Sequence, residues 1–299
     1  MKKSFSLTFV AAIGLSATTG ANAQGAFSSV EITAEEIAPG IAVLFGAGGN
    51  IGLSFGEEDT LIIDDQFAPL STKIERAIAD LGAKPVSYVV NTHWHFDHTG
   101  GNEHFGKTGA SIFAHENVRI RLAKGSSEGI GGRPIPPAPP EALPVVTYAQ
   151  GVSLHLNGDT IHVMFLGGGH TDGDSVVFWE EDNVIHMGDL YFKIPGYPFI
   201  DLASGGNVYD AMRSLDLVIA RIDSDTKVIP GHGPMSNKAE LVAYRAMIGE
   251  VVRRVEALKV DGLTLEEAVA RQPLADIERG DNGFIGPDQF IEAVWNSAS

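Results

Sequence analysis

The chain contains no cysteine among its 299 residues, so no disulfide supports the fold and no thiolate is available to bind a metal ion. Basic residues are also few. Against 38 aspartates and glutamates there are 21 lysines and arginines, and the formal net charge is −17. Such acidity repels phosphate backbones and argues against a nucleic-acid partner. No apolar run is long enough to cross a bilayer, so we expect no membrane span. The sequence carries no indication of an oligomeric state.

The first 23 residues have the pattern of a secretory signal peptide. A basic start, Met1-Lys2-Lys3, precedes a short apolar core over 9–15 and a small-residue cleavage signal at Ala21-Asn22-Ala23. The apolar core is too short for a transmembrane helix. The sequence therefore predicts removal of 1–23 after Ala23 and a periplasmic or secreted mature protein.

The segment over 91–101 carries most of the chemical information. Four side chains that can bind a metal ion fall within six positions, namely His93, His95, Asp97 and His98. The preceding run over 85–90 is short, apolar and rich in β-branched residues, as in a buried strand, and a Gly pair follows the segment. A histidine-rich surface loop is the simpler alternative. The whole pattern directly after a strand favours a metal site, in which His93 and His95 share one ion while Asp97 and His98 face a second.

This pattern resembles the signature of the metallo-β-lactamase superfamily, whose members are mostly dinuclear metal hydrolases. Three later segments place further ligands in the family order, each after an apolar run: His170 within 165–175, Asp189 within 184–189 and His232 within 228–233. The resemblance implies one ion held by His93, His95 and His170. It implies a second ion held by Asp97, His98 and His232, with Asp189 bridging the two.

The resemblance also implies hydrolytic activity on a small-molecule substrate. We expect an exported dinuclear zinc hydrolase, with Zn²⁺ the expected metal and Fe or Mn compatible with the oxygen-rich set. Its metal-activated hydroxide would attack a carbonyl carbon, and Asp97 would orient it and accept its proton. Amide hydrolysis of the β-lactamase kind fits the exported location. Hydrolysis of lactones, thioesters or other esters fits Asp189, because one β-lactamase subclass has a cysteine near this position. A periplasmic protein that only binds metal is a further alternative.

Other residues are predicted to support the site. Lys193 follows Asp189 closely and is expected to bind a substrate carboxylate, as a lysine does in some lactamases. Asp64, after a strand, is expected to hold the ligand segment over 91–101 in place. Thr171 is expected to orient the backbone beside His170. Two loops could shape the substrate pocket: the Gly- and Pro-rich stretch over 125–144, equally readable as a linker, and the aromatic stretch over 192–200.

Alternating segments indicate an α/β fold. Strands are expected over 41–45, 51–55, 60–64, 85–90, 111–114, 151–156, 159–165, 175–179, 184–187 and 227–229. Helices are expected over 71–81, 102–105, 115–124, 208–221, 236–257, 264–271 and 286–296. The resemblance implies that these elements form a four-layer αβ/βα sandwich. We expect one hydrolase domain over 24–260 and a C-terminal helical extension over 261–299 packed on the same domain.

Overall fold

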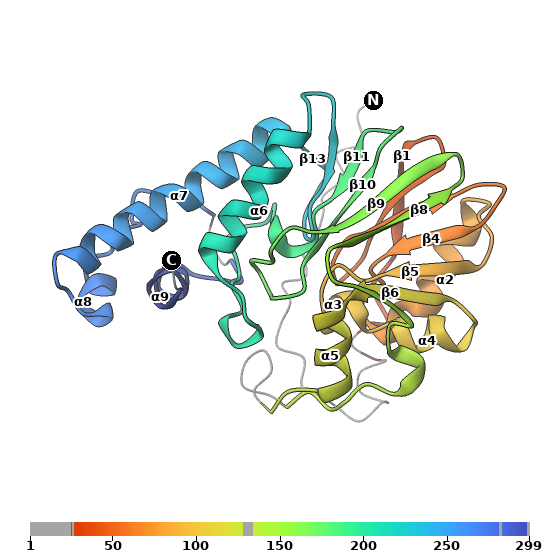
Figure 1. The fold of residues 1–299 in the computed structure, drawn as a ribbon, viewed down its shortest axis with the longest axis horizontal. Helices are drawn as coiled ribbons and strands as arrows, with labels where there is room; N and C mark the ends of the chain where they lie inside the picture. The colour runs from red at the N-terminus through yellow and green to blue at the C-terminus, as the bar shows by residue number, and fades with distance from the viewer. Residues whose placement is uncertain (1–24, 26, 128–133, 281–282, 298–299) are drawn as a thin grey trace.

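A computed structural model of the chain describes residue 25 and residues 27–127, 134–280 and 283–297. The predicted signal peptide over 1–23 lies outside the described residues. Two β-sheets face each other, and helices cover the outer face of each (Figure 1). Among the described residues, no helix combines the length and apolar character needed to span a bilayer.

The first sheet has seven strands in sequence order, β1 to β7. They are Thr33–Ala38, Ile41–Phe45, Ile51–Phe55, Thr60–Ile63, Val86–Val90, Ser111–His115 and Val146–Tyr148. The second sheet has six strands in the order β13-β12-β11-β10-β9-β8. Following the chain from β8 to β13, they are Gly151–Leu156, Asp159–Phe165, Ser175–Trp179, Val184–His186, Lys227–Ile229 and Ser236–Asn237.

The parallel part of each sheet positions the polar strand ends. Strands β4 to β7 pair in parallel, as do β11 and β12, while the other pairs are antiparallel. Parallel strands end at the same edge, so the loops after β4 and β5 are neighbours, and so are the loops after β11 and β12. A hydrogen bond from the Asn50 amide to the Gly231 carbonyl, 2.7 Å long, joins the two sheets at this end.

Three apolar clusters show the layering. One lies between the sheets and includes Val43, Ile63 and Trp179. A second fills the space between the first sheet and α2 (Ser71–Asp80), whose Ile74 and Ile78 lie one turn apart. The third covers the outer face of the second sheet and includes residues of α6 (Val208–Arg221), α7 (Lys238–Val260) and α9 (Pro287–Asn296). The predicted αβ/βα sandwich is confirmed.

The remaining helices are α3 (Phe96–Thr99), α4 (Asn102–Lys107), α5 (Glu116–Lys124) and α8 (Leu265–Ala270). Polar caps define several starts. The Asn207 side chain accepts from two backbone amides at the start of α6, and Thr264 and Glu267 form a capping box on α8. Buried residues of α9, including Phe290, lie in the same cluster as α6 and α7. The boundary at 260 between domain and extension stays a prediction.

The sequence pattern missed several short elements. Strand β1 is mostly exposed, so its TAEEIA sequence has no apolar face. Strand β7 spans three residues, and α3 is a single turn inside the metal-ligand segment, which we expected to be a loop. The helix expected from 236 begins at Lys238, because Asn237 caps it and pairs in β13. Elements this short bury too few residues to leave a periodic signal.

Candidate metal centre

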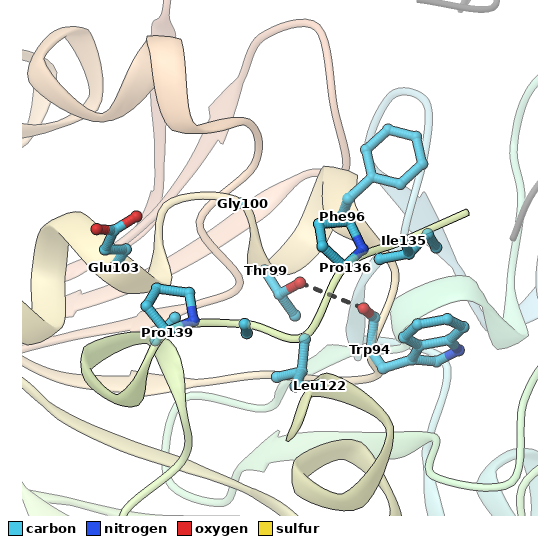
Figure 2. A pocket seen from close by; sticks show the side chains of 11 residues that line it. Trp94, Phe96, Thr99, Gly100, Glu103, Leu122, Ile135, Pro136 and Pro139 are labelled. Carbon is cyan, nitrogen blue, oxygen red and sulfur yellow. Dashed lines mark hydrogen bonds between the residues drawn. The ribbon is translucent and has the colours of Figure 1, made fainter. Parts of the chain in front are cut away.

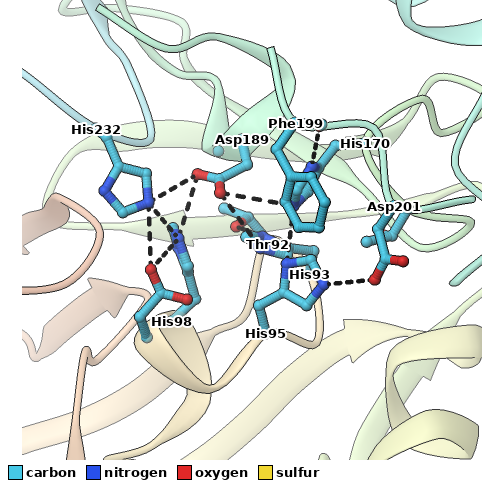
Figure 3. Close-up of polar contacts among 12 residues, drawn as sticks. Thr92, His93, His95, His98, His170, Asp189, Phe199, Asp201 and His232 are labelled. Carbon is cyan, nitrogen blue, oxygen red and sulfur yellow. Dashed lines mark hydrogen bonds and ion pairs between the residues drawn. The ribbon is translucent and has the colours of Figure 1, made fainter. Parts of the chain in front are cut away.

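Loops from both sheets converge on one cluster of histidines and carboxylates (Figure 3). The first sheet contributes the segment after β5, and the second contributes the loops after β9, β11 and β12. All seven predicted ligands lie in this cluster. Their ligand atoms form two groups, each within 4.8 Å: His93, His95, His170 and Asp189, and Asp97, His98 and His232.

Asp189 lies between the groups. Its Oδ2 is 3.7 Å from His93 Nε2 and 3.6 Å from His170 Nε2. Its Oδ1 is 3.2 Å from His98 Nε2 and 3.4 Å from His232 Nε2. Each carboxylate oxygen thus faces one group, which is the arrangement that a bridging ligand needs. The residue sits in the turn η4 (Gly188–Leu190), directly after β11.

Four of the histidines each have one ring nitrogen within hydrogen-bonding distance of an oxygen atom outside the ligand set. We call this nitrogen the outer nitrogen and the other ring nitrogen the inner one. His95 Nε2 lies 2.9 Å from Asp201 Oδ2, and His170 Nδ1 lies 2.6 Å from the Phe199 carbonyl. A carbonyl or carboxylate oxygen only accepts, so the outer nitrogen of each ring carries the proton and donates it. The inner nitrogen then presents a lone pair to the cluster. Such outer contacts fix the tautomer and orientation of metal-binding histidines.

The same logic applies on the first sheet. His98 Nδ1 lies 2.7 Å from Asp64 Oδ2, and His93 Nδ1 lies 3.0 Å from Thr92 Oγ1. The Thr92 hydroxyl donates its own proton to Asp64, so its oxygen is left to accept from His93. Asp64 also accepts from the Thr92 backbone amide at 2.7 Å. Asp64 is thus hydrogen-bonded to two residues of the ligand segment, Thr92 and His98, and its role in steadying bound metal stays a prediction.

The cluster favours a positive charge at its centre. In the second group, burial alone would lower the pKa of His232, but Asp189 and Asp97 outweigh burial and raise that pKa to about 9. In the first group, burial lowers the pKa of His170 to about 4, and neighbouring His95 lowers it further. Burial likewise lowers the pKa of His93, so the first group favours neutral rings at His93 and His170, while the carboxylates of Asp189 and Asp97 surround the centre of the second group.

Three observations fit bound metal ions. The inner nitrogens of His95 and His170 are 2.8 Å apart, and two facing lone pairs repel unless a cation lies between them. Seven buried side-chain polar atoms of the described residues make no hydrogen bond, and two of them, His93 Nε2 and Asp189 Oδ1, lie in this cluster. Buried polar atoms without partners are rare and call for an explanation such as an ion. Imidazole nitrogens with carboxylate oxygens form a donor set suited to zinc.

Several supporting residues gave no signal in the sequence. Asp201 holds His95, but it lies 106 positions away from that histidine. The Asn50 side chain donates to the carbonyls of Pro230 and Gly233 and so holds the His232 loop. His186 is buried and accepts from the Gly188 amide at 3.1 Å, so it supports the turn that carries Asp189.

The structure also places the other predicted site residues. Thr171 donates to Asp174 from both its amide and its hydroxyl, so the two side chains fix the turn after His170. The Lys193 ammonium instead faces away from the ligands: it pairs with Glu240 at 2.6 Å and donates to the Met235 carbonyl. This ion pair already uses the charge that a substrate carboxylate would need. The substrate-binding role of Lys193 stays a prediction.

The sequence model for the metallo-beta-lactamase superfamily matches residues 46–233. The chain belongs to the metallo-β-lactamase superfamily. It is thus a member of a family of metal-dependent hydrolases. The match ends before α7, so residues beyond 233, including all three C-terminal helices, lie outside the family model.

Curated relatives within the superfamily differ in their reactions. A metallo-beta-lactamase type 2 from Bacteroides fragilis is 29% identical over 168 residues, which cover 56% of this chain and 61% of the relative. A hydroxyacylglutathione hydrolase from Methylococcus capsulatus is 26% identical over 208 residues, covering 68% of this chain and 70% of the relative. The chain thus spans about three fifths of the B. fragilis relative's length.

Solved structures agree on the fold. A metallo-β-lactamase from Pontibacter korlensis superposes with a TM-score of 0.60 at 21% identity, covering 73% of this chain and 99% of that chain. A metallo-β-lactamase from Cronobacter sakazakii with a HARLDQ motif gives a TM-score of 0.62 at 23% identity, covering 79% of this chain and 98% of that chain. At these identities the likeness shows the superfamily fold alone.

A cavity of about 170 Å³ lies beside the ligand segment, mostly lined by apolar residues (Figure 2). The described part of the loop over 125–144 lines one side of this cavity, where Ile135 and Pro136 contribute. Ile135 pairs with Ser126 inside the same loop, and its side chain packs against the buried cluster that includes Trp94 and Leu122. Trp94 is buried there. Phe96 is 44% exposed, and its ring packs against Phe67 with centroids 5.7 Å apart.

Proposed function

We propose that this protein is an exported hydrolase that holds two zinc ions and cleaves a carbonyl substrate, with the amide bond of a β-lactam-like ring as the first candidate. The observation that carries the proposal is that the two carboxylate oxygens of Asp189 face two different groups of ligands. The B. fragilis relative supports the choice of amide. The predicted signal peptide supports export.

The ligands have distinct tasks in this proposal. When bound, the ions supply Lewis acidity toward a carbonyl oxygen and lower the pKa of nearby water. Asp97 lies on the more open side of the second group, 3.3 Å from His232 Nε2. We propose that its carboxylate orients the attacking water and accepts its proton. Asp201 and the Phe199 carbonyl keep the inner nitrogens of His95 and His170 free of protons.

A thioester or lactone hydrolase is the second candidate. A carboxylate at Asp189 presents one oxygen to each group, whereas a single thiolate at this position would favour one ion. The hydroxyacylglutathione hydrolase relative covers more of this chain than the β-lactamase relative does. Both candidates share the metal pair and differ in the leaving atom, which is nitrogen in one and sulfur or oxygen in the other.

Metal content and a substrate panel test the proposed reaction. We expect the purified mature protein to hold two zinc ions per chain, measured by elemental analysis, and a chelator to abolish hydrolysis. The panel comprises a cephalosporin, a lactone, a thioester and a phosphodiester. Full metal occupancy without hydrolysis of any carbonyl substrate would leave only a metal-binding role. An active enzyme with trace metal would refute the metal pair.

Export is tested by locating the mature chain. When the full chain is expressed in a Gram-negative host, we expect it in the periplasmic fraction with Gln24 as its first residue, because the signal pattern ends at Ala23. N-terminal sequencing of the fractionated protein gives the result. A cytoplasmic protein that keeps Met1 would contradict the proposed location. A variant with Lys2 and Lys3 replaced by glutamate is the matched control and should export poorly.

A further inference from the structure

The loop that follows Asp189 carries a half-buried phenylalanine against the first metal group. The Phe199 ring stacks on His95, with centroids 5.8 Å apart, and meets His170 edge-on at 5.4 Å (Figure 3). Its backbone carbonyl also holds His170. The ring is therefore fixed beside two ligands, and any substrate that reaches the first group meets it.

A second aromatic ring extends this surface from far along the chain. Phe284, in the segment between α8 and α9, meets Phe199 edge-on with centroids 5.6 Å apart and planes at 89°. Edge-to-face contacts of this kind are favourable in themselves. Even so, half of the Phe284 side chain is exposed to solvent, at 50%. Among the described residues, the exposed large apolar side chains include two aromatic rings, Phe96 and Phe284, and both adjoin the ligands or their contacts.

The backbone around Phe284 is anchored to the loop that carries Phe199. Gly196 donates to the Arg279 carbonyl at 2.7 Å, and the Tyr197 amide donates to the Ile285 carbonyl at 2.9 Å. The Arg279 side chain returns a bond to the Gly196 carbonyl. Gly283 lies so close to the loop that a Cβ there would sit 2.2 Å from the Gly196 Cα. The exposed ring is thus held on a fixed backbone.

An apolar side chain that is both fixed and exposed at a site marks a surface for a ligand. We propose that Phe284 and Phe199 form an aromatic wall that binds the apolar acyl part of the substrate, so that the C-terminal segment determines specificity. The inference rests on the proposed function, since hydrolysis of an amide, ester or thioester leaves a carboxylate attached to that acyl part. The wall would select substrates that carry an aromatic or long aliphatic group on the carbonyl carbon.

Binding of simple carboxylates tests the wall without turnover. Phenylacetate and acetate share the group that meets the metal centre and differ by the ring. For the zinc-loaded mature protein, we expect calorimetry to show phenylacetate binding at least about 10-fold more tightly than acetate, the scale of a good aromatic contact. Phe284→Ala should weaken phenylacetate about 5- to 10-fold and leave acetate unchanged, while Phe284→Tyr keeps the parent preference.

Leu217→Ala provides the control, because Leu217 is similarly exposed, at 54%, but lies on α6. It should alter neither affinity, and thermal melting shows whether each variant is folded. Equal phenylacetate binding by the parent and Phe284→Ala would overturn the wall, as would a parent that binds phenylacetate no better than acetate. The metal analysis and substrate panel judge the proposed function separately, because neither involves Phe284.

Discussion

A His95→Ala variant is expected to lose one of two zinc ions per chain and to have a strongly reduced kcat/KM. Loss of a residue that only hydrogen-bonds a metal ligand lowers activity about 10- to 100-fold, and we expect loss of the ligand itself to cost more. His95 supplies one of three imidazoles in the first group, and the remaining two nitrogens with Asp189 form an incomplete set. His232→Ala should remove the ion of the second group instead. Elemental analysis with steady-state kinetics measures both effects.

The comparison between these two variants is informative because the groups differ in charge. An ion in the second group would be held by two carboxylates and two imidazoles, counting Asp189, and an ion in the first by three imidazoles and Asp189. His155→Ala is the control, since this histidine is exposed and outside the cluster. Retention of both ions and near-parent rates in His95→Ala and His232→Ala would refute the ligand assignment.

Asp189→Asn should be nearly as damaging, although it changes one atom. The carboxylate is the ligand that both groups share, and an amide of the same size removes its negative charge. We expect weaker binding of one ion and a fall in kcat with every substrate. Zinc titration monitored by occupancy and kinetics measures the result. Unchanged metal affinity and unchanged rates would show that Asp189 is an ordinary turn residue.

Asp189→Cys separates the two candidate reactions. A thiolate is soft and favours a single ion over a shared bridge. We therefore expect this variant to keep a larger share of β-lactam hydrolysis than of thioester or lactone hydrolysis. Asp216→Asn, which alters an exposed ion pair with Arg245, is the control and should affect neither ratio. An equal loss across the panel would count against a role for the bridge in substrate preference.

The candidate ligands could be located from the sequence because their signals are local, and the fold brings them together. His93, His95, Asp97 and His98 lie in one segment after a strand, and every other ligand follows its own apolar run within a few residues. Strand and helix positions were equally accessible, since buried elements repeat with the period of their geometry. The sandwich itself was predicted from the resemblance, and the structure confirms it.

The support around the ligands was not predictable in the same way. Asn50 and Pro230 are joined by a hydrogen bond across 180 positions, and Asp201 and His95 across 106. A lone asparagine or aspartate in a loop looks like a turn residue until the fold brings its partner near. Phe284 is a similar case, because its significance depends on where the C-terminal segment packs. For Lys193, the family pattern suggested a contact with substrate. The sequence did not indicate that α7 would bring Glu240 beside this lysine as an ion-pair partner.

Because the ligands come from both sheets, metal binding could stabilise this cysteine-free chain in the way that a disulfide stabilises others. His98 comes from the first sheet and His232 from the second, 134 positions apart, and their inner nitrogens lie 3.2 Å from each other. An ion held by both closes that length of chain as a covalent cross-link would, restricting the unfolded ensemble more than the folded one. Bound metal would thus join the two halves of a chain that has no disulfide, at the proposed catalytic centre.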